Sequence, residues 1–271
     1  MPEGHTIHRL ARDHTRDYVG QRLAVSSPQG RFADGAAAVD GRSLARVEAF
    51  GKHLFYWWDS GEIVHVHLGL YGKFRRHTVG ADGAVPEPRG AVRMRVVGDA
   101  KAFDLNGPTA CEVMDESGRD RIAARLGEDP LRDDVDVDAA RERVMGSRAA
   151  VGRMLQDQSV IAGVGNIFRA EALFIAGVHP ERVGTSLGAE EFDRLWSAVC
   201  EMLKVGVKYN RIITTDPAEV GVSRGRMKAD QRVHVYKKER CPRCDGRIKA
   251  WEVGARMCFA CPKCQPKRGK R

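Results

Sequence analysis

Long apolar runs are missing from this sequence. No stretch approaches the roughly 20 apolar residues that a membrane-spanning helix needs. The longest aromatic run, Leu-Phe-Tyr-Trp-Trp at residues 54–58, has the length of a buried strand. The opening residues, Met1 to Arg9, are polar and lack the apolar core of a signal peptide. We therefore expect a soluble, cytoplasmic protein.

No internal repeat is visible, and acidic residues are scarce near the C-terminus. Residues 231–271 hold 13 Lys and Arg against 3 Asp and Glu, whereas the first 230 residues are nearly neutral. Such localised charge indicates a polyanionic partner, with a basic solubilising tail as the alternative. Of the 271 residues, 42% are hydrophobic, which is too many for a disordered chain and enough for folded cores. The length suits two domains and a small module.

The spacing of apolar residues separates a strand-rich part from a helical part. Residues 3–18 have helical periodicity. Alternating patterns then predict a β-sandwich or barrel with strands at residues 22–25, 42–50, 53–58, 63–68, 91–97 and 102–105. An acidic stretch from Leu126 to Asp138 marks a domain boundary. Helical spacing follows around residues 151–155, 167–174 and 192–203, and residues 211–230 are expected to form a mobile loop.

Seven cysteines in an intracellular protein indicate metal ligands or free thiols rather than disulfides. Two Cys-x-x-Cys knuckles stand 16 residues apart, Cys241 with Cys244 and Cys261 with Cys264. Four thiolates complete the tetrahedral coordination of zinc, so this spacing predicts one structural Zn²⁺ ion. A ligand set that pairs Cys258 with Cys261 is the alternative. Cys111 and Cys200 lie in apolar contexts and are expected to be core residues.

The knuckles flank a strand-like segment at residues 247–253, followed by Gly254, which predicts a β-hairpin. The module's basic side chains are Arg243, Arg247, Lys249, Arg256 and Lys263. A rigid hairpin with this charge suits phosphate binding, although zinc ribbons also bind proteins. Without metal, a module this small has little core and is expected to unfold.

Two glycines precede the helix expected from Ile167. Gly163 and Gly165 permit close approach of the backbone, and the free N–H groups at the helix N-terminus favour a phosphate. Asn166 can cap this helix or donate its amide to a ligand. An ordinary turn between two helices, capped by Asn166, is the alternative.

The first residues offer a nucleophile. Removal of Met1 would leave Pro2 as an N-terminal amine, and an α-amino group has a reference pKa of about 7.7–8.0, against about 10.4 for lysine. Such an amine is partly neutral near pH 7 and can form an iminium with an electrophilic carbon. Glu3 is the adjacent group for proton transfer. The alternative is an ordinary terminus in which Pro2 opens a helix.

These features occur together with further motifs, in one order. The chain opens Met-Pro-Glu-Gly, and before the knuckles it carries Phe-Gly-Lys-His-Leu at 50–54, His-Leu-Gly-Leu-Tyr-Gly-Lys-Phe at 67–74, Leu-Gly-Glu-Asp-Pro-Leu at 126–131 and Gly-Val-Gly-Asn-Ile-Phe-Arg at 163–169. From Pro2 to Cys264 the set resembles the formamidopyrimidine-DNA glycosylase/endonuclease VIII family of base-excision repair enzymes. The resemblance implies an α+β multidomain fold. Its parts would be an N-terminal β-sandwich with flanking helices (1–130), a helical domain with a helix–two-turns–helix motif and the mobile loop (131–230), and a β-hairpin zinc finger (231–271).

The resemblance also implies the chemistry. Pro2 matches the family's nucleophile, which attacks C1′ of the damaged nucleotide and forms a Schiff base. Glu3 matches the general acid/base. Lys52 matches a lysine that contacts a DNA phosphate beside the lesion and supports catalysis. The implied activity is that of a DNA glycosylase with abasic-site lyase activity, which cleaves the strand by β,δ-elimination without a redox cofactor or catalytic metal.

Lys52, Asn166 and Arg256 would come from three modules and converge on one bent phosphate backbone. Asn166, with Gly163 and Gly165, matches the phosphate-binding turn, and Arg256 matches the zinc-hairpin arginine that grips the same strand. The loop residues Leu70 and Tyr71 match a wedge that fills the void left by an everted base. Taken alone, that pair would be interpreted as a buried strand end.

The Leu-Tyr pair and the Met-Pro-Glu-Gly-His-Thr start resemble the endonuclease VIII branch, which prefers oxidised pyrimidines. His-Leu-Gly at 67–69 is similar to the purine branch, which usually begins Met-Pro-Glu-Leu-Pro-Glu. The expected substrate is therefore an oxidised pyrimidine in damaged double-stranded DNA. The expected protein is a bacterial-type, nucleoid-associated monomer. A non-catalytic zinc-finger DNA-binding protein, a purine-branch glycosylase and a zinc-ribbon protein adaptor are the alternatives.

Overall fold

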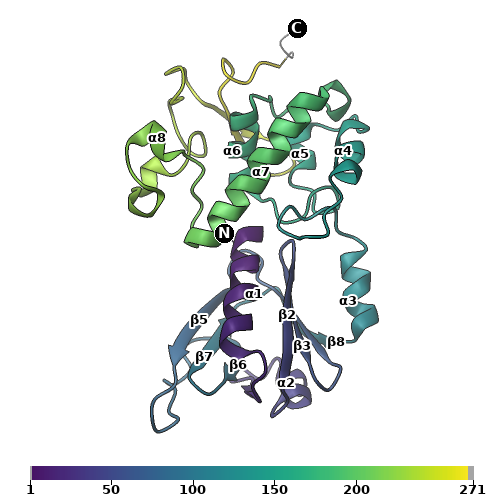
Figure 1. The fold of residues 1–271 in the computed structure, drawn as a ribbon, viewed down its shortest axis with the longest axis vertical. Helices are drawn as coiled ribbons and strands as arrows, with labels where there is room; N and C mark the ends of the chain where they lie inside the picture. The colour runs from purple at the N-terminus through teal and green to yellow at the C-terminus, as the bar shows by residue number, and fades with distance from the viewer. Residues whose placement is uncertain (1, 268–271) are drawn as a thin grey trace. The chain divides into compact units, whose positions relative to one another are not determined.

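The computed structural model describes residues 2–267 and divides the chain into two compact units (Figure 1). Unit 1 comprises Pro2 and residues 7–125. Unit 2 comprises residues 3–6 and residues 126–267. Helix α1 (Gly4–Tyr18) therefore begins in unit 2 and continues in unit 1.

Unit 1 is a β-sandwich of two four-stranded antiparallel sheets. One sheet has the strand order β2-β3-β4-β8 and the other β1-β6-β7-β5. The strands are β1 (Ala24–Ser26), β2 (Leu44–Phe50), β3 (His53–Trp58), β4 (Ile63–His67), β5 (Lys73–Thr78), β6 (Val92–Val97), β7 (Lys101–Asn106) and β8 (Ala110–Met114). Two further helices, α2 (Ala33–Val39) and α3 (Glu116–Ala123), complete the unit.

The core of unit 1 follows from residue alternation. In β6, Val92, Met94 and Val96 are buried while the residues between them are partly exposed, as expected of a strand with one face on the core. Strands of both sheets contribute to one hydrophobic cluster, which also includes Ile7 and Leu10 of α1. The alternating patterns therefore predicted the sandwich correctly.

Strands β5 and β8 were not among those expected from the sequence. Each lies at the edge of its sheet. The sequence of β5, Lys-Phe-Arg-Arg-His-Thr, is almost entirely polar or charged and is partly or fully exposed. Charged side chains are a common protection for the open edge of a sheet, and they remove the apolar alternation that identifies a strand.

Unit 2 is built around two long helices. Its helices are α4 (Val137–Met145), α5 (Val151–Met154), α6 (Asn166–Ala176), α7 (Ala189–Tyr209) and α8 (Pro217–Val220), and its strands are β9 (Lys249–Glu252) and β10 (Met257–Ala260). Helix α6 packs on α7, and one cluster buries Phe168, Leu173, Leu195 and Val199 from the two helices. None of the helices in the described part of the chain is long and apolar enough to span a bilayer.

The segment expected as a mobile loop, residues 211–230, has more structure than a loop. It contains α8 and two 3₁₀ turns. Ile213 and Met227 are buried in a cluster with Val205 of α7. Two apolar residues so far apart in sequence have no periodicity, so the pattern could not reveal this packing.

Candidate functional site

Glu3 is fully buried and lies at the N-terminus of α6. Its carboxylate accepts hydrogen bonds from the backbone N–H groups of Gly165 (2.9 Å), Ile167 (2.9 Å) and Phe168 (3.4 Å). Amides at the start of a helix have no partner inside the helix. The carboxylate therefore caps α6, and the helix dipole stabilises its negative charge.

This arrangement corrects one expectation. Asn166 does not cap α6; it is the first residue of the helix, the N-cap is Gly165, and Glu3 occupies the amide groups expected to meet a phosphate. Gly165 provides the room, since a Cβ there would lie 2.4 Å from the Glu3 carboxyl carbon. Gly163 adopts φ +89°, and its carbonyl accepts the N–H of Gly4 at 2.7 Å. The glycines thus accommodate residues 3 and 4 of the chain.

Pro2, the residue before Glu3, is partly buried and precedes α1. The predicted removal of Met1 concerns a position outside the described residues. The residue after Pro2, Glu3, belongs to unit 2, where its side chain is held by three hydrogen bonds.

Arg256 lies at the turn of the predicted hairpin. Strands β9 and β10 pair antiparallel, with Glu252 opposite Met257. Between them Gly254 and Ala255 adopt φ of +61° and +57°, the two left-handed positions of a type I′ turn. Arg256 follows this turn and is exposed. The hairpin was predicted correctly.

Arg169 fastens this turn to α6, and sequence reasoning gave it no role. Its side chain is fully buried and donates to the carbonyls of Val253 (2.9 Å), Arg256 (3.3 Å) and Met257 (3.1 Å). Burial lowers the pKa of this guanidinium. A sequence signal existed, because Arg169 stands three residues after Asn166 and so shares its helix face.

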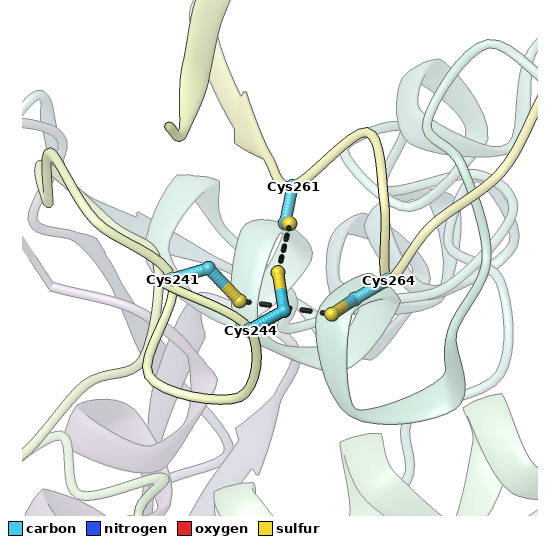
Figure 2. Close-up of side chains that lie close together, drawn as sticks. All are labelled: Cys241, Cys244, Cys261 and Cys264. Carbon is cyan, nitrogen blue, oxygen red and sulfur yellow. Dashed lines mark hydrogen bonds between the residues drawn. The ribbon is translucent and has the colours of Figure 1, made fainter. Parts of the chain in front are cut away.

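The four knuckle cysteines converge on one point (Figure 2). All four Sγ atoms lie within 4.8 Å of one another, and the group comprises Cys241, Cys244, Cys261 and Cys264. The Sγ–Sγ distance is 3.7 Å between Cys241 and Cys264 and 3.5 Å between Cys244 and Cys261. Zn–S bonds of about 2.3 Å in a tetrahedron place sulfurs roughly 3.8 Å apart. The group can therefore hold a metal ion, and its donors and spacing fit zinc.

Cys258 lies outside this group. It is buried on β10, where it pairs with Trp251 of β9. The alternative ligand set that used Cys258 is thus not the one formed, because strand pairing places this residue in the hairpin rather than in a knuckle.

The cysteine module packs against α6. Ala170 and Phe174 of α6 share a hydrophobic cluster with Cys241 and Cys261. The Arg243 guanidinium lies 4.3 Å from the Phe174 ring centroid and donates to the Phe174 carbonyl at 3.1 Å. Arg243, expected among the phosphate-binding side chains, therefore has a packing role.

Lys52 lies in unit 1, in the two-residue turn between β2 and β3. Gly51 precedes it with φ +57°, a conformation that favours glycine. Lys52 is half-buried. The next residue, His53, makes a 2.9 Å ring hydrogen bond to His65, and burial lowers the pKa of His53 to about 3. His53 is therefore neutral near pH 7 and adds no charge beside Lys52.

Leu70 and Tyr71 lie in the loop between β4 and β5 of unit 1. Their exposed fractions are 49% and 84%, so the interpretation as a buried strand end is wrong. Gly72 closes the loop by donating its N–H to the Leu68 carbonyl at 2.9 Å. The loop therefore presents two large apolar side chains to solvent, which is unusual unless a partner covers them.

Comparisons with known proteins cover nearly the whole chain. Residues 1–107 match the family model of the formamidopyrimidine-DNA glycosylase N-terminal domain, and residues 126–218 match that of the formamidopyrimidine-DNA glycosylase H2TH domain. The chain is 46% identical over 267 residues to "Endonuclease 8 1" of Mycobacterium tuberculosis, which covers 98% of this chain and 100% of that protein. It is 30% identical over 272 residues to a formamidopyrimidine-DNA glycosylase of Halorhodospira halophila, with 98% of both chains covered.

The fold is similar to that of Lactococcus lactis Fpg, solved in complex with DNA that contains an abasic site. The TM-score is 0.78, and the match covers 98% of this chain and 100% of the other. At 22% sequence identity this likeness establishes the three-part fold alone.

Proposed function

The chain belongs to the formamidopyrimidine-DNA glycosylase/endonuclease 8 family, whose members are DNA glycosylases with abasic-site lyase activity, and we propose that it excises oxidised pyrimidines from double-stranded DNA. The 46% identity to an endonuclease 8, against 30% to a formamidopyrimidine-DNA glycosylase, supports the pyrimidine branch. The proposed setting is the cytoplasm, at the nucleoid, with the protein acting as a monomer.

The proposed reaction starts at Pro2 once Met1 is removed. The Pro2 nitrogen forms a bond to C1′ of the everted nucleotide while the bond from C1′ to the base breaks and the base leaves with a proton. Opening of the sugar ring leaves a cationic iminium between Pro2 and C1′, which acidifies C2′. Loss of a C2′ proton expels the 3′ phosphate, and a second elimination expels the 5′ phosphate. Glu3 moves the protons in these steps.

The observation that carries this proposal is the placement of Glu3. A buried carboxylate held by three backbone amides at a helix N-terminus is pre-oriented, so no reorganisation is needed when a proton moves. The residue before it is the proposed nucleophile, only one peptide bond away.

The remaining residues are proposed to bind the DNA. Lys52, Asn166 and Arg256 contact backbone phosphates around the lesion, and Leu70 with Tyr71 fills the space of the everted base. The exposure of Leu70 and Tyr71 supports this role, since side chains that enter a base stack must be available at the surface.

The metal is proposed to be one structural zinc ion. Four thiolates leave no open coordination position for water or substrate, so the ion would hold the hairpin that presents Arg256 and take no part in the chemistry.

Borohydride trapping tests the proposed chemistry. The mature protein, incubated with a duplex that contains thymine glycol or an abasic site, is expected to form a reduced covalent adduct through Pro2. A variant that retains Met1, which places an extra residue before Pro2 and removes its free amine, is the matched control and should give none. Failure of the mature protein to form an adduct, despite tight duplex binding, would identify a non-catalytic DNA-binding protein instead. Excision rates on a panel of oxidised purines and pyrimidines then decide the branch.

A further inference from the structure

The Asn166 amide is engaged on both of its polar atoms. Its Oδ1 accepts from Nε2 of Gln156 at 2.8 Å and from Nη2 of Arg169 at 2.6 Å, and its Nδ2 donates to the carbonyl of Met257 at 3.1 Å. The side chain is 7% exposed. A reversed amide would set NH₂ against the Arg169 guanidinium and oxygen against a carbonyl, so the network assigns one orientation.

Two donors on one carbonyl oxygen saturate its two lone pairs, which lie in the amide plane. Arg169 and Gln156 together therefore fix the plane of the Asn166 amide as well as its direction. Only one hydrogen of the Asn166 NH₂ group is used by Met257. The second points in a direction set by that plane.

The Gln156 side chain is placed to orient the Asn166 amide. It follows the short helix α5, and its backbone N–H donates to the Arg153 carbonyl at 3.0 Å. Within residues 2–267 its side chain makes the one hydrogen bond to Asn166. Its Oε1 lies 3.8 Å from where a Cβ would stand on Gly254, in the turn before Arg256. It is half-buried, so replacing it leaves no large cavity.

Arg169 differs in this respect. It is fully buried and also holds three carbonyls of the hairpin, so its removal would disturb the whole module. A substitution at Gln156 therefore changes the orientation of the Asn166 amide and leaves the hydrogen bonds that attach the hairpin in place.

We propose that Gln156 is a positioning residue that holds the Asn166 amide in the plane from which its remaining N–H meets a DNA phosphate. The proposal rests on the proposed function, because it requires Asn166 to be a phosphate ligand. Gln156 itself does not touch the DNA.

Gln156→Met keeps the length of the side chain and removes the donor, whereas Gln156→Glu keeps the shape and turns an acceptor toward Oδ1. The dissociation constant is measured for a duplex that contains a tetrahydrofuran abasic analogue. We expect binding about threefold weaker for Gln156→Met and about tenfold weaker for Gln156→Glu, as for the loss of one neutral hydrogen bond and its replacement by a repulsive contact. Gln29→Glu in unit 1 is the control for added charge.

A double-variant comparison with Asn166 distinguishes a positioning role of Gln156 from a general loss of structure. In an Asn166→Ala background, Gln156→Met is expected to have no further effect on affinity. The thermal unfolding midpoint of Gln156→Met in the otherwise unmutated protein should stay at the unmutated value, because Gln156 is half-buried and holds no element in place. An equal loss of affinity in both backgrounds would overturn the proposal.

The two proposals fail in different ways. If the unmutated protein does not bind the duplex, or Asn166→Ala binds as tightly as it does, the phosphate contact of the proposed function is wrong. If Asn166→Ala weakens binding and Gln156→Met and Gln156→Glu do not, the inference about Gln156 alone is wrong.

Discussion

Glu3 has both a structural role and a proposed catalytic role. It satisfies three backbone amides at the start of α6, and it is the proposed group for proton transfer. The donors are 162 to 165 residues away in sequence. A Cβ on Gly165 would lie 2.4 Å from the Glu3 carboxyl carbon, and one on Gly4 would lie 2.8 Å from the Gly163 Cα, contacts that no spacing rule could reveal.

Glu3→Gln tests both properties. Excision of thymine glycol is expected to fall by about 10²–10⁴-fold, because an amide cannot move the proton. Binding to an abasic-analogue duplex should be retained. Because the amide NH₂ would face a backbone N–H, the free energy of unfolding should also fall, by about 1–2 kcal/mol. Single-turnover excision, duplex binding and urea unfolding measure the three effects; normal excision would refute the acid/base role.

At the scale of elements, His234 connects α8, in the 211–230 segment, to α6 through two hydrogen bonds to carboxylates. His234 is buried and hydrogen-bonds Glu171 of α6 through Nδ1 and Glu219 of α8 through Nε2, each at 3.0 Å. Both ring nitrogens can donate to carboxylates only when the imidazole is protonated. Burial acts to lower the pKa of His234, but the hydrogen bonds and charges of Glu171 and Glu219 outweigh it and raise the pKa.

A raised pKa in the folded state makes stability depend on pH. The contribution of His234 is complete below its unfolded pKa of about 6.5 and is lost as pH rises through the folded value. The difference in unfolding free energy between the unmutated protein and His234→Gln should therefore shrink from pH 6 to pH 9 in urea unfolding. His179→Gln is the control, since burial lowers the pKa of His179 and predicts the opposite trend. A difference that does not vary with pH would contradict this account.

The zinc module depends on both its metal and its contact with α6. Phe174 and Ala170 pack in one cluster with Cys241 and Cys261, so the knuckles that carry the metal also supply the module's contact with α6. The same helix packs on α7 through Phe168 and Leu173, independently of the module. Metal removal should therefore unfold the hairpin before the helical core.

A strong chelator is expected to raise amide hydrogen exchange in residues 249–260 while α6 and α7 stay protected. DNA affinity should fall with the same metal dependence. Cys261→Ala should lose the bound metal, whereas Cys258→Ala, the matched control outside the sulfur group, should keep one ion per chain. Affinity that survives complete metal loss would show that the hairpin does not bind the DNA.

At the scale of the whole molecule, the positive charge favours binding to a polyanion such as DNA. The basic excess is concentrated in residues 231–271, and a further proposed phosphate ligand, Lys52, lies in the other unit. Each phosphate contact releases a counterion when DNA binds.

Lys52→Ala and Arg256→Ala are each expected to reduce the slope of log affinity against log salt by about one. The effects should add in the double variant, because each residue is proposed to contact a phosphate of its own. Binding of an abasic-analogue duplex from low to high salt measures the slopes. Lys101→Ala, an exposed lysine on β7, should leave the slope unchanged. Unchanged slopes in all variants would exclude these two phosphate contacts.

The sequence by itself determined the class of the fold, the two knuckles and the hairpin between them, because these follow from local periodicity and spacing. It also placed Glu3 and Asn166 in recognisable motifs. Only the tertiary structure decided that Glu3 rather than Asn166 caps α6, that Arg169 and Gln156 hold the Asn166 amide, and that Ile213 and Met227 pack against Val205 of α7. The reason is that hydrogen bonds and packing join residues by position in space, and contacts between isolated polar or apolar side chains far apart in sequence carry no local pattern.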